Sequence, residues 1–247
     1  MINIKYDLKT IDENRSILKD FLISKSENIK SENFKKISEK DLHILFELYD
    51  EIFLKDWFKQ NFKGKIKFIL SKQLTRAAGN TRTKKNIAQI RSEDIEFEVK
   101  ISLNHLSNFD KIERSKYVGG IEANSILESL MLVFEHEICH VIEFLVLKKS
   151  SCRKKPYKDL IFNIFGQTET THKLVSVNEV NAYEYGLKLG DKVRFIYNGK
   201  FVNGFIQRIN KRATVMSPDL HGNYMDRSGK RYKKFYVSLE SLTKSNS

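Results

Sequence analysis

Two histidines and a glutamate near the middle of the chain have a spacing that allows chemistry on a metal ion. His136, Glu137 and His140 form an H-E-x-x-H pattern. On an α-helix, positions i and i+4 lie on the same face, so both imidazoles can bind one ion. Glu137 lies about 100° further round the helix than His136, where it can take a proton from a metal-bound water. The pattern therefore predicts a zinc site with Glu137 as general base.

The residues around this pattern predict a long, buried helix. Ser125 and Glu128 have the spacing of a capping box at the helix start. Apolar residues then recur almost all round the helix as far as Val146, without Gly or Pro. Burying acids and histidines without partners is costly, so we expect several of those in this helix to have partners. The acids are Glu128, Glu135, Glu137 and Glu143.

Length and composition predict a soluble protein with a sizeable core. The 247 residues allow one large domain or two smaller ones, and 40% are hydrophobic. No uncharged apolar run approaches the roughly 20 residues of a membrane span, and the first residues lack the form of a signal peptide. Cys139 and Cys152 make no disulfide framework. We therefore expect a cytoplasmic protein without a membrane partner.

Positive charge is concentrated at the C-terminal end. The chain carries a net +13, and residues 187–247 hold 13 basic and 4 acidic residues, a net +9. Such a segment indicates a polyanion partner, most simply nucleic acid. The alternative is a basic surface that only keeps the protein solvated.

Helices and short strands are predicted before the metal helix. Residues 9–60 have helical spacing, with an apolar stripe from Leu42 to Phe58 and a polar segment at 24–40 that is a loop or an exposed helix. Residues 65–72 alternate as a strand does, 74–82 indicate a turn, and 86–90 and 95–103 predict two further strands. The expected result is a small sheet beside the metal helix.

Three segments together resemble the SprT-like metalloprotease domain, the domain of SprT and Spartan. They are residues 48–53, residues 70–79 with L-T-R-A-A-G at their end, and residues 134–140 with the H-E-x-x-H pattern. The similarity covers roughly residues 42–172. It implies a zincin-like α+β domain with a Zn²⁺ cofactor that hydrolyses peptide bonds, with protein or peptide substrates that include DNA-associated proteins.

The third metal ligand is left open by the sequence. A catalytic zinc has three protein ligands, and SprT-like proteins supply the third from an H-G-x-x-F segment. Arg153 stands at that place here, and arginine stays protonated and cannot bind zinc. The available substitutes are His172, Cys152, Glu179 and, on the metal helix itself, Glu143. We rank His172 first, so the predicted metal ligands are His136, His140 and His172.

The last 60 residues predict a small β-barrel. Residues 192–197, 201–209, 212–216 and 234–238 read as strands, with a short helical turn at 239–242. Asn198-Gly199 is a strong hairpin signal, because both residues tolerate positive φ. The Gly-Asp-Lys-Val opening at 190–193 and the residues at 209–215 resemble an SH3-like barrel of the KOW type.

Basic side chains in this region lie near tyrosines, a combination that suits phosphate contact with base stacking. The alternative is a barrel that packs on the metal domain, with lysines for solubility. By the resemblance, DNA is favoured over RNA. The predicted nucleic-acid residues are Arg208, Lys211, Arg212, Arg231, Lys233 and Lys234.

The sequence thus predicts an N-terminal helical extension (1–41), a zincin-like domain (42–186) and a basic SH3-like barrel (187–247). The function expected is zinc-dependent peptide hydrolysis. One alternative is a nucleic-acid-binding protein whose metal site is structural or vestigial, which the Arg153 position favours. Another is a metallohydrolase that acts on bonds other than peptides.

Overall fold

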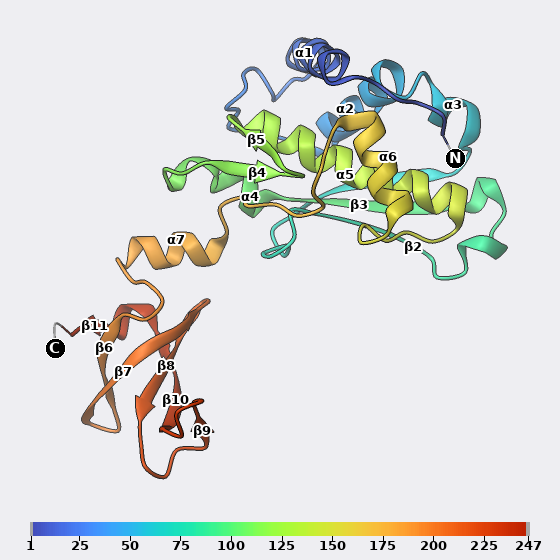
Figure 1. Ribbon diagram of the computed structural model, residues 1–247. Coiled ribbons are helices and arrows are strands. Elements are labelled where there is room, and N and C mark those ends of the chain that lie inside the picture. The colour runs from blue at the N-terminus through green and yellow to red at the C-terminus, as the bar shows by residue number, and fades with distance from the viewer. Residues whose placement is uncertain (1, 246–247) are drawn as a thin grey trace. The chain divides into compact units, whose positions relative to one another are not determined.

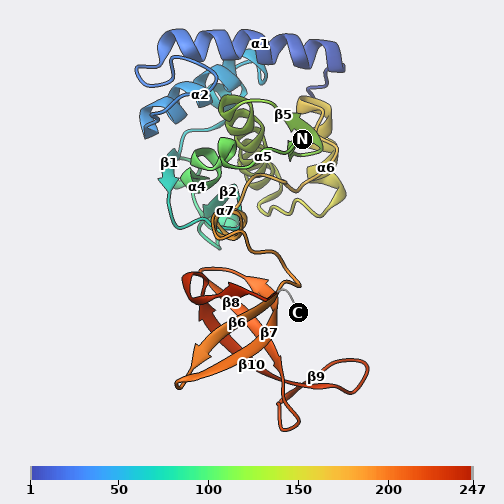
Figure 2. The ribbon, with the colours of Figure 1, turned by 90° about the vertical axis from the view of Figure 1, so that its left-hand side faces the viewer.

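The structure, a computed structural model, describes residues 2–245 and has a mixed α+β architecture. The chain divides into two compact units. The first runs to Phe109 and includes Glu113–Leu174, and the second comprises Asp110–Ile112 and the chain from Val175 onward. The first unit holds most of the helices and two small sheets, while the second is dominated by one larger sheet (Figures 1 and 2).

The units differ from the predicted domains at two places. Residues 2–41 belong to the first unit rather than to a separate extension, because Ile11, Leu18 and Leu22 are buried in its core. Residues 175–186, predicted as part of the metal domain, belong to the second unit, where Ala182 packs against the core. The predicted domain ends at residues 1 and 246–247 lie outside the described residues.

Three helices open the first unit: α1 (Leu8–Lys25), α2 (Glu39–Ile52) and the short α3 (Trp57–Asn61). Asp7 caps α1, since its carboxylate accepts a hydrogen bond of 2.7 Å from the Thr10 amide. The helical spacing predicted for the apolar stripe is confirmed on α2, where Leu42, Leu45 and Leu48 are buried. Residues 24–40 were predicted as a loop or an exposed helix. The structure has a loop there, between the end of α1 at Lys25 and the start of α2 at Glu39.

Asp41 holds this loop to the start of α2. Its buried carboxylate accepts hydrogen bonds from the Ser26 hydroxyl (2.5 Å), the Asn28 amide group (2.9 Å) and the Ser38 backbone amide (2.7 Å). Burial raises the pKa of this carboxyl, but the hydrogen bonds outweigh burial and lower the pKa below its usual value. Asp41 is therefore expected to stabilise the fold as a carboxylate.

Asp41→Asn should lower the free energy of unfolding at pH 7 by about 1–3 kcal/mol, because it removes a charged acceptor from buried donors. The folded-state pKa lies below the unfolded value of 3.8. The contribution is therefore complete above that value and is lost as the pH falls through the folded-state pKa. Urea unfolding between pH 7 and pH 3 measures it, with the exposed Asp20→Asn as control. If the difference in free energy of unfolding between the wild type and Asp41→Asn stayed unchanged down to pH 3, the stabilising role of the Asp41 carboxylate would be contradicted.

A three-stranded sheet follows in the order β1-β3-β2. Strands β1 (Lys65–Ser71) and β3 (Glu96–Ser102) run parallel, and β2 (Gly79–Thr83) pairs with β3 antiparallel, which makes β2 an edge strand. One face of the sheet is apolar and buried, with Phe68, Phe97 and Val99 among its residues. The strands predicted at 65–72 and 95–103 are confirmed.

Two predictions in this region are wrong. Residues 79–82 were predicted to lie in a turn, but they belong to strand β2. The side chains of β2 show no alternation of apolar and polar residues, and its backbone pairs with β3. Residues 86–90, predicted as a strand, contain the short 3₁₀-helix η1 (Ile87–Gln89), with Ile87 buried. A second 3₁₀ turn, η2 (Ser92–Asp94), then leads into β3. Local patterning missed β2 because its pairing partner, β3, is a separate segment further along the chain.

Short elements connect the sheet to the helix that carries the H-E-x-x-H pattern. They are α4 (Leu103–Ser107), η3 (Phe109–Lys111) and a hairpin of β4 (Lys116–Val118) and β5 (Ile121–Ala123). Gly119 and Gly120 turn this hairpin with φ values of +61° and +83°, a conformation that side chains with a Cβ rarely adopt.

Helix α5 (Ile126–Leu147) is the buried helix that the sequence predicts. The Ser125 hydroxyl caps it by accepting a hydrogen bond from the Glu128 amide (3.1 Å). Glu128 does not return the bond to Ser125 as in a capping box, because its carboxylate accepts from the Asn124 amide (2.8 Å). The three-stranded sheet lies on one side of α5, and α1 and α2 lie on the other (Figures 1 and 2). Helix α6 (Lys155–Phe165) follows and packs against α5.

The second unit contains α7 (Val177–Glu184) and a sheet in the order β11-β6-β7-β8-β10-β9. Its strands are β6 (Lys192–Tyr197), β7 (Lys200–Ile209), β8 (Arg212–Pro218), β9 (Tyr224–Met225), β10 (Arg231–Ser238) and β11 (Thr243–Lys244). They form a barrel-like sheet around an apolar core that includes Val193, Ile206 and Val215. The Asn198-Gly199 hairpin turn is confirmed, since both residues have positive φ.

Within residues 2–245, none of the helices has the length and apolar composition needed to cross a membrane.

Candidate metal centre

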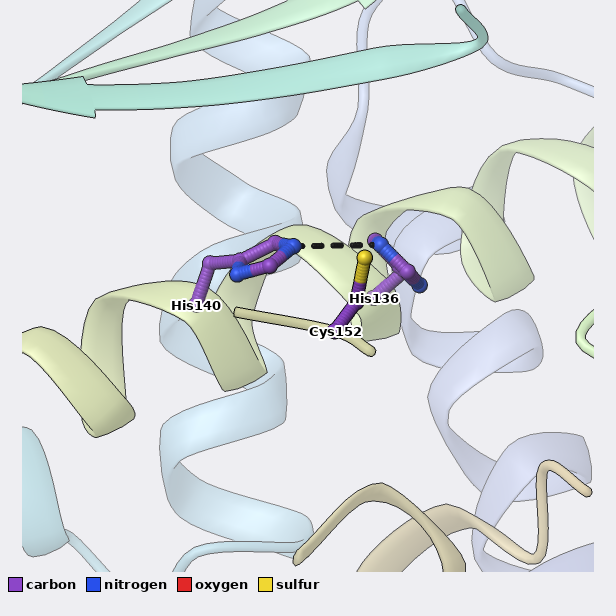
Figure 3. Close-up of side chains that lie close together, drawn as sticks. All are labelled: His136, His140 and Cys152. Carbon is purple, nitrogen blue, oxygen red and sulfur yellow. Dashed lines mark hydrogen bonds between the residues drawn. The ribbon is translucent and has the colours of Figure 1, made fainter. Parts of the chain in front are cut away.

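Helix α5 places His136 and His140 side by side, as the i, i+4 spacing predicts. Their Nε2 atoms lie 3.2 Å apart and point toward the same region (Figure 3). Two nitrogens that bind one zinc at about 2.0–2.1 Å with tetrahedral angles lie about 3.3–3.4 Å apart. The separation in the structure therefore fits two ligands of one ion.

Cys152 supplies a third donor atom from the loop between α5 and α6. Its sulfur points toward the space between the two imidazoles (Figure 3), and one ligand atom from each of the three residues lies within 4.8 Å of the others. The loop turns back because Lys148 ends α5 in a left-handed conformation, with φ of 57°. Cys152 is half-buried and the next residue, Arg153, is exposed. Arg153, at the position where the family has its third ligand, is therefore exposed to solvent. Cys152, the residue before it, faces His136 and His140.

Glu143 orients this loop and His140 together. Its carboxylate accepts hydrogen bonds from the Ser150 hydroxyl (2.6 Å) and the Ser151 amide (2.8 Å). The Ser150 oxygen also lies 2.6 Å from Nδ1 of His140. Since a carboxylate can only accept, Ser150 donates to Glu143 and accepts from the Nδ1–H of His140. This tautomer leaves the lone pair of His140 on Nε2, the atom beside His136.

Tyr157 on α6 closes the other side of the two imidazoles. Its ring centroid lies 4.5 Å from that of His140 and 5.2 Å from that of His136, and its hydroxyl donates to the His136 carbonyl (2.8 Å). Burial lowers the pKa of His140 to about 4. Burial, with smaller contributions from His140 and His172, lowers the pKa of His136 to about 3. Both rings are therefore neutral at neutral pH, the form that binds metal.

Glu137 is buried beside the edge strand β2. The Thr81 hydroxyl donates to its Oε2 atom (2.7 Å), and its Oε1 atom faces Gly79 so closely that a Cβ at position 79 would overlap it. Burial raises the pKa of Glu137 to about 7, partly opposed by the hydrogen bonds of Thr81. A carboxyl with this pKa can gain and lose a proton near neutral pH, as a general base must.

His172, ranked first as third ligand, lines a small pocket together with His136. The pocket measures about 130 Å³, and His136, Glu137, Gly79 and His172 are among its lining residues. The Nε2 atom of His172 lies 3.1 Å from the Arg76 carbonyl oxygen, and its backbone forms a bridge with Val118. The structure groups Cys152, and not His172, with His136 and His140.

The two acidic candidates have other partners. Glu143 binds the serines of the loop, as described above, instead of joining the group of donor atoms. Glu179 lies in the second unit, where its carboxylate accepts from the amide (2.9 Å) and hydroxyl of Ser176 in the capping box of α7. Both carboxylates are thus engaged in holding local structure.

The donor set of His136, His140 and Cys152 fits zinc by its chemistry. Imidazole nitrogen and thiolate sulfur are the ligands that zinc takes most often in proteins, and a catalytic site uses three of them. The second ring nitrogen of His140 has a partner that fixes its orientation, as is usual for metal-binding histidines. The residues present are therefore compatible with one zinc ion.

The six predicted nucleic-acid residues do not form one patch on the second unit. Strand register pairs Lys234 with Met216 and Lys233 with Ser217, so these two neighbours point to opposite faces of the sheet. Lys234 lies over the Tyr224 ring, 3.8 Å from its centroid, and Arg231 donates to the Gly222 carbonyl (3.3 Å). The other three, Arg208, Lys211 and Arg212, are exposed at or near the β7–β8 turn.

Two residues of the centre were not anticipated from the sequence. Thr81 lies in the strand that was predicted as a turn, and nothing in the local pattern marks it. Ser150 gives a weaker signal, because it belongs to a Ser-Ser pair that follows a helix with a buried acid in its last turns. The sequence predicts that the buried acids of α5 have partners, but it does not identify Ser150 as the partner of Glu143.

Comparisons of the chain with protein-family models, with curated proteins and with solved structures return no match. The function is therefore argued from the geometry of the site.

Proposed function

We propose that this chain is a zinc-dependent peptidase of the SprT-like type, with His136, His140 and Cys152 as zinc ligands and Glu137 as general base. One observation carries the proposal: three donor atoms of the types zinc prefers lie together, next to a buried carboxyl whose pKa is near 7. Cys152 takes the place in which His172 was expected.

The surroundings of α5 support a zincin-like arrangement. The helix packs against β2 and β3, and β2 is the edge strand of that sheet. An extended peptide can add to such an edge through main-chain hydrogen bonds. A peptide bound there would lie beside Glu137, because Gly79 and Thr81 of β2 both contact its carboxyl group.

The chemistry divides between the ion and the side chains. A zinc ion held by this centre would polarise a carbonyl oxygen and make a water molecule acidic near neutral pH. Glu137 would accept a proton from the attacking water and give it to the leaving amine. Thr81 would hold Glu137 in place through Oε2, and His172, on the pocket wall, would contact the substrate.

The proposed substrates are proteins associated with nucleic acid. The second unit supports this part of the proposal, since residues 187–247 carry a net +9. The SprT-like resemblance favours DNA over RNA and covalently attached proteins as targets. Localisation in the cytoplasm stays a prediction.

The alternative is a nucleic-acid-binding protein with a structural zinc site. The enclosure of the centre favours it, because structural zinc sites are closed whereas catalytic ones keep an open position. Tyr157 packs on both imidazoles, and Ser150 and Cys152 of the following loop lie beside them. The two proposals agree on the metal and differ in whether peptide bonds are cleaved.

Zinc content of the purified protein tests both proposals. We expect about one zinc per chain, retained in His172→Ala and lost in Cys152→Ala, because a site with two ligands binds weakly. Cys139→Ala, a buried cysteine on α5, is the matched control and should keep its zinc. Cleavage of an unfolded protein substrate, with and without DNA, is measured on the same preparations. Zinc without cleavage would select the structural alternative, and a wild type that binds no zinc would contradict both.

A further inference from the structure

A groove of about 680 Å³ opens on the barrel-like sheet of the second unit. The β6–β7 hairpin forms one wall, and the ends of β8 and β10 form the other. It is distinct from the metal centre and from five of the six predicted nucleic-acid residues. Its walls include Tyr197, Lys200, Val202, Ser217, Pro218, Lys233 and Phe235.

The groove is an exposed continuation of the barrel core. Along β6, alternate residues point to the same face, so Val193, Phe195 and Tyr197 follow one another from the core to the groove. Val193 and Phe195 are buried, whereas Tyr197 is 47% exposed. On β10, Phe235 packs against the core and Lys233, two residues earlier, is exposed. The sheet therefore extends beyond the residues that fill its interior and leaves apolar surface open.

Aromatic rings and cations alternate along this surface. The Tyr197 ring meets the Phe235 ring edge-on with centroids 5.1 Å apart. Lys200 pairs with Tyr197 across the hairpin and so points to the same face, whereas Phe201 and Arg194 point to the opposite face. Lys233 lies over Phe235 at 5.6 Å. An exposed ring beside a cation can stack on a base while the cation contacts the neighbouring phosphate.

We infer that this groove binds single-stranded nucleic acid, with Tyr197 as the stacking residue and Lys200 and Lys233 as phosphate contacts. Charge complementarity identifies the occupant: Asp219 is the one acid among the lining residues, and residues 187–247 carry a net +9. A duplex hides the faces of its bases, so exposed rings favour a single strand. The inference rests on the nucleic-acid part of the proposed function and gives it a site and a ligand class.

The test is fluorescence anisotropy of a labelled single-stranded oligothymidylate with the full chain at two salt concentrations. Tyr197→Ala should weaken binding about 5- to 100-fold, and Lys200→Glu should weaken it and reduce its salt dependence. Tyr236→Ala is the matched control. It removes a tyrosine that is 66% exposed and that alternates to the opposite face of β10 from Phe235. The control should bind as the wild type does.

Three results would overturn the inference. They are equal binding by the wild type and Tyr197→Ala, preference for a duplex of the same length over the single strand, and competition at the groove by a proline-rich peptide but not by the oligonucleotide. Thermal melting checks that the exposed-site variants are folded. Protein cleavage is measured separately: groove binding without cleavage would contradict only the peptidase, and cleavage without groove binding would contradict only this inference.

Discussion

Glu137→Gln is expected to abolish peptide-bond cleavage while leaving bound zinc unchanged. The amide has nearly the size and shape of the carboxyl group, so it can still accept the Thr81 hydrogen bond and fit beside Gly79. It cannot take up a proton near pH 7 as a carboxyl with a pKa of about 7 can. Removing a general base typically costs about 10²–10⁴ in rate. We therefore expect at least a 100-fold loss of cleavage.

Single-turnover cleavage of a labelled unfolded protein, with zinc content determined on the same sample, measures this effect. Glu128→Gln is the matched control, because it makes the same change in α5 at the end far from the histidines. Retained cleavage in Glu137→Gln, with zinc still bound, would eliminate Glu137 as the base. Loss of zinc together with cleavage would instead indicate that the carboxyl supports the fold of the centre.

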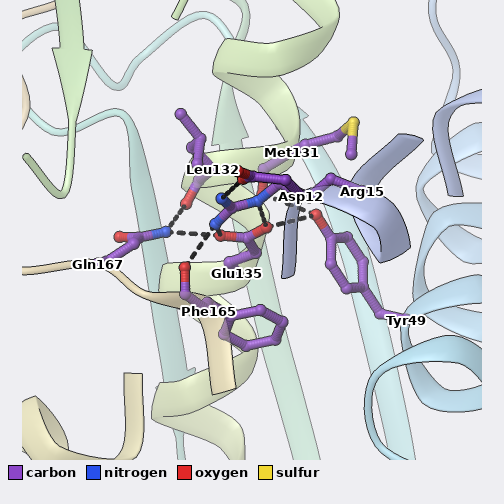
Figure 4. Close-up of polar contacts among 8 residues, drawn as sticks. All are labelled: Asp12, Arg15, Tyr49, Met131, Leu132, Glu135, Phe165 and Gln167. Atoms are coloured by element: carbon purple, nitrogen blue, oxygen red, sulfur yellow. Dashed lines mark hydrogen bonds and ion pairs between the residues drawn. The ribbon is translucent and has the colours of Figure 1, made fainter. Parts of the chain in front are cut away.

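Arg15→Met is expected to lower the free energy of unfolding by about 3–5 kcal/mol, the cost of leaving a buried charge without its partner. Glu135 on α5 is fully buried, and Arg15 on α1 binds it through two hydrogen bonds of 2.8 and 2.7 Å. Tyr49 and Gln167 donate to the same carboxylate at 3.1 and 2.9 Å (Figure 4). Burial lowers the pKa of Arg15, but Glu135 outweighs it and raises the pKa, so the guanidinium stays charged.

Urea unfolding of the full chain tests this prediction. The double variant Arg15→Met, Glu135→Leu should recover part of the loss, because it removes both charges together. Arg91→Met is the matched control, since its ion pair with Asp94 is exposed and should contribute at most about 1 kcal/mol. A loss below 1 kcal/mol for Arg15→Met, or no recovery in the double variant, would contradict the assigned role of Arg15.

This network also explains why α1 belongs to the first unit. Arg15 donates to the Phe165 carbonyl at the end of α6 (2.6 Å) as well as to Glu135, so it connects three helices (Figure 4). Glu135 directly precedes His136. The N-terminal segment, to which the sequence assigned no role, thus supplies the counter-charge for an acid next to the candidate metal centre.

The sequence by itself determined the features that depend on neighbouring residues. His136 and His140 lie together because four residues make about one helical turn. The capped apolar run around them predicts a buried helix, and α5 is one. The hairpin at Asn198-Gly199 and the strands on either side follow from positive φ and alternation. Each of these depends on backbone geometry within a few residues.

Tertiary structure decided the features that depend on distant residues. Cys152 replaced His172 beside the histidines because Glu143 holds the intervening loop through Ser150 and Ser151. Strand β2 formed from residues with no strand pattern because β3 offered an open edge. In the same way, Arg15 met Glu135 across 120 residues. Such contacts bring together side chains whose positions along the chain are unrelated, so no local periodicity records them.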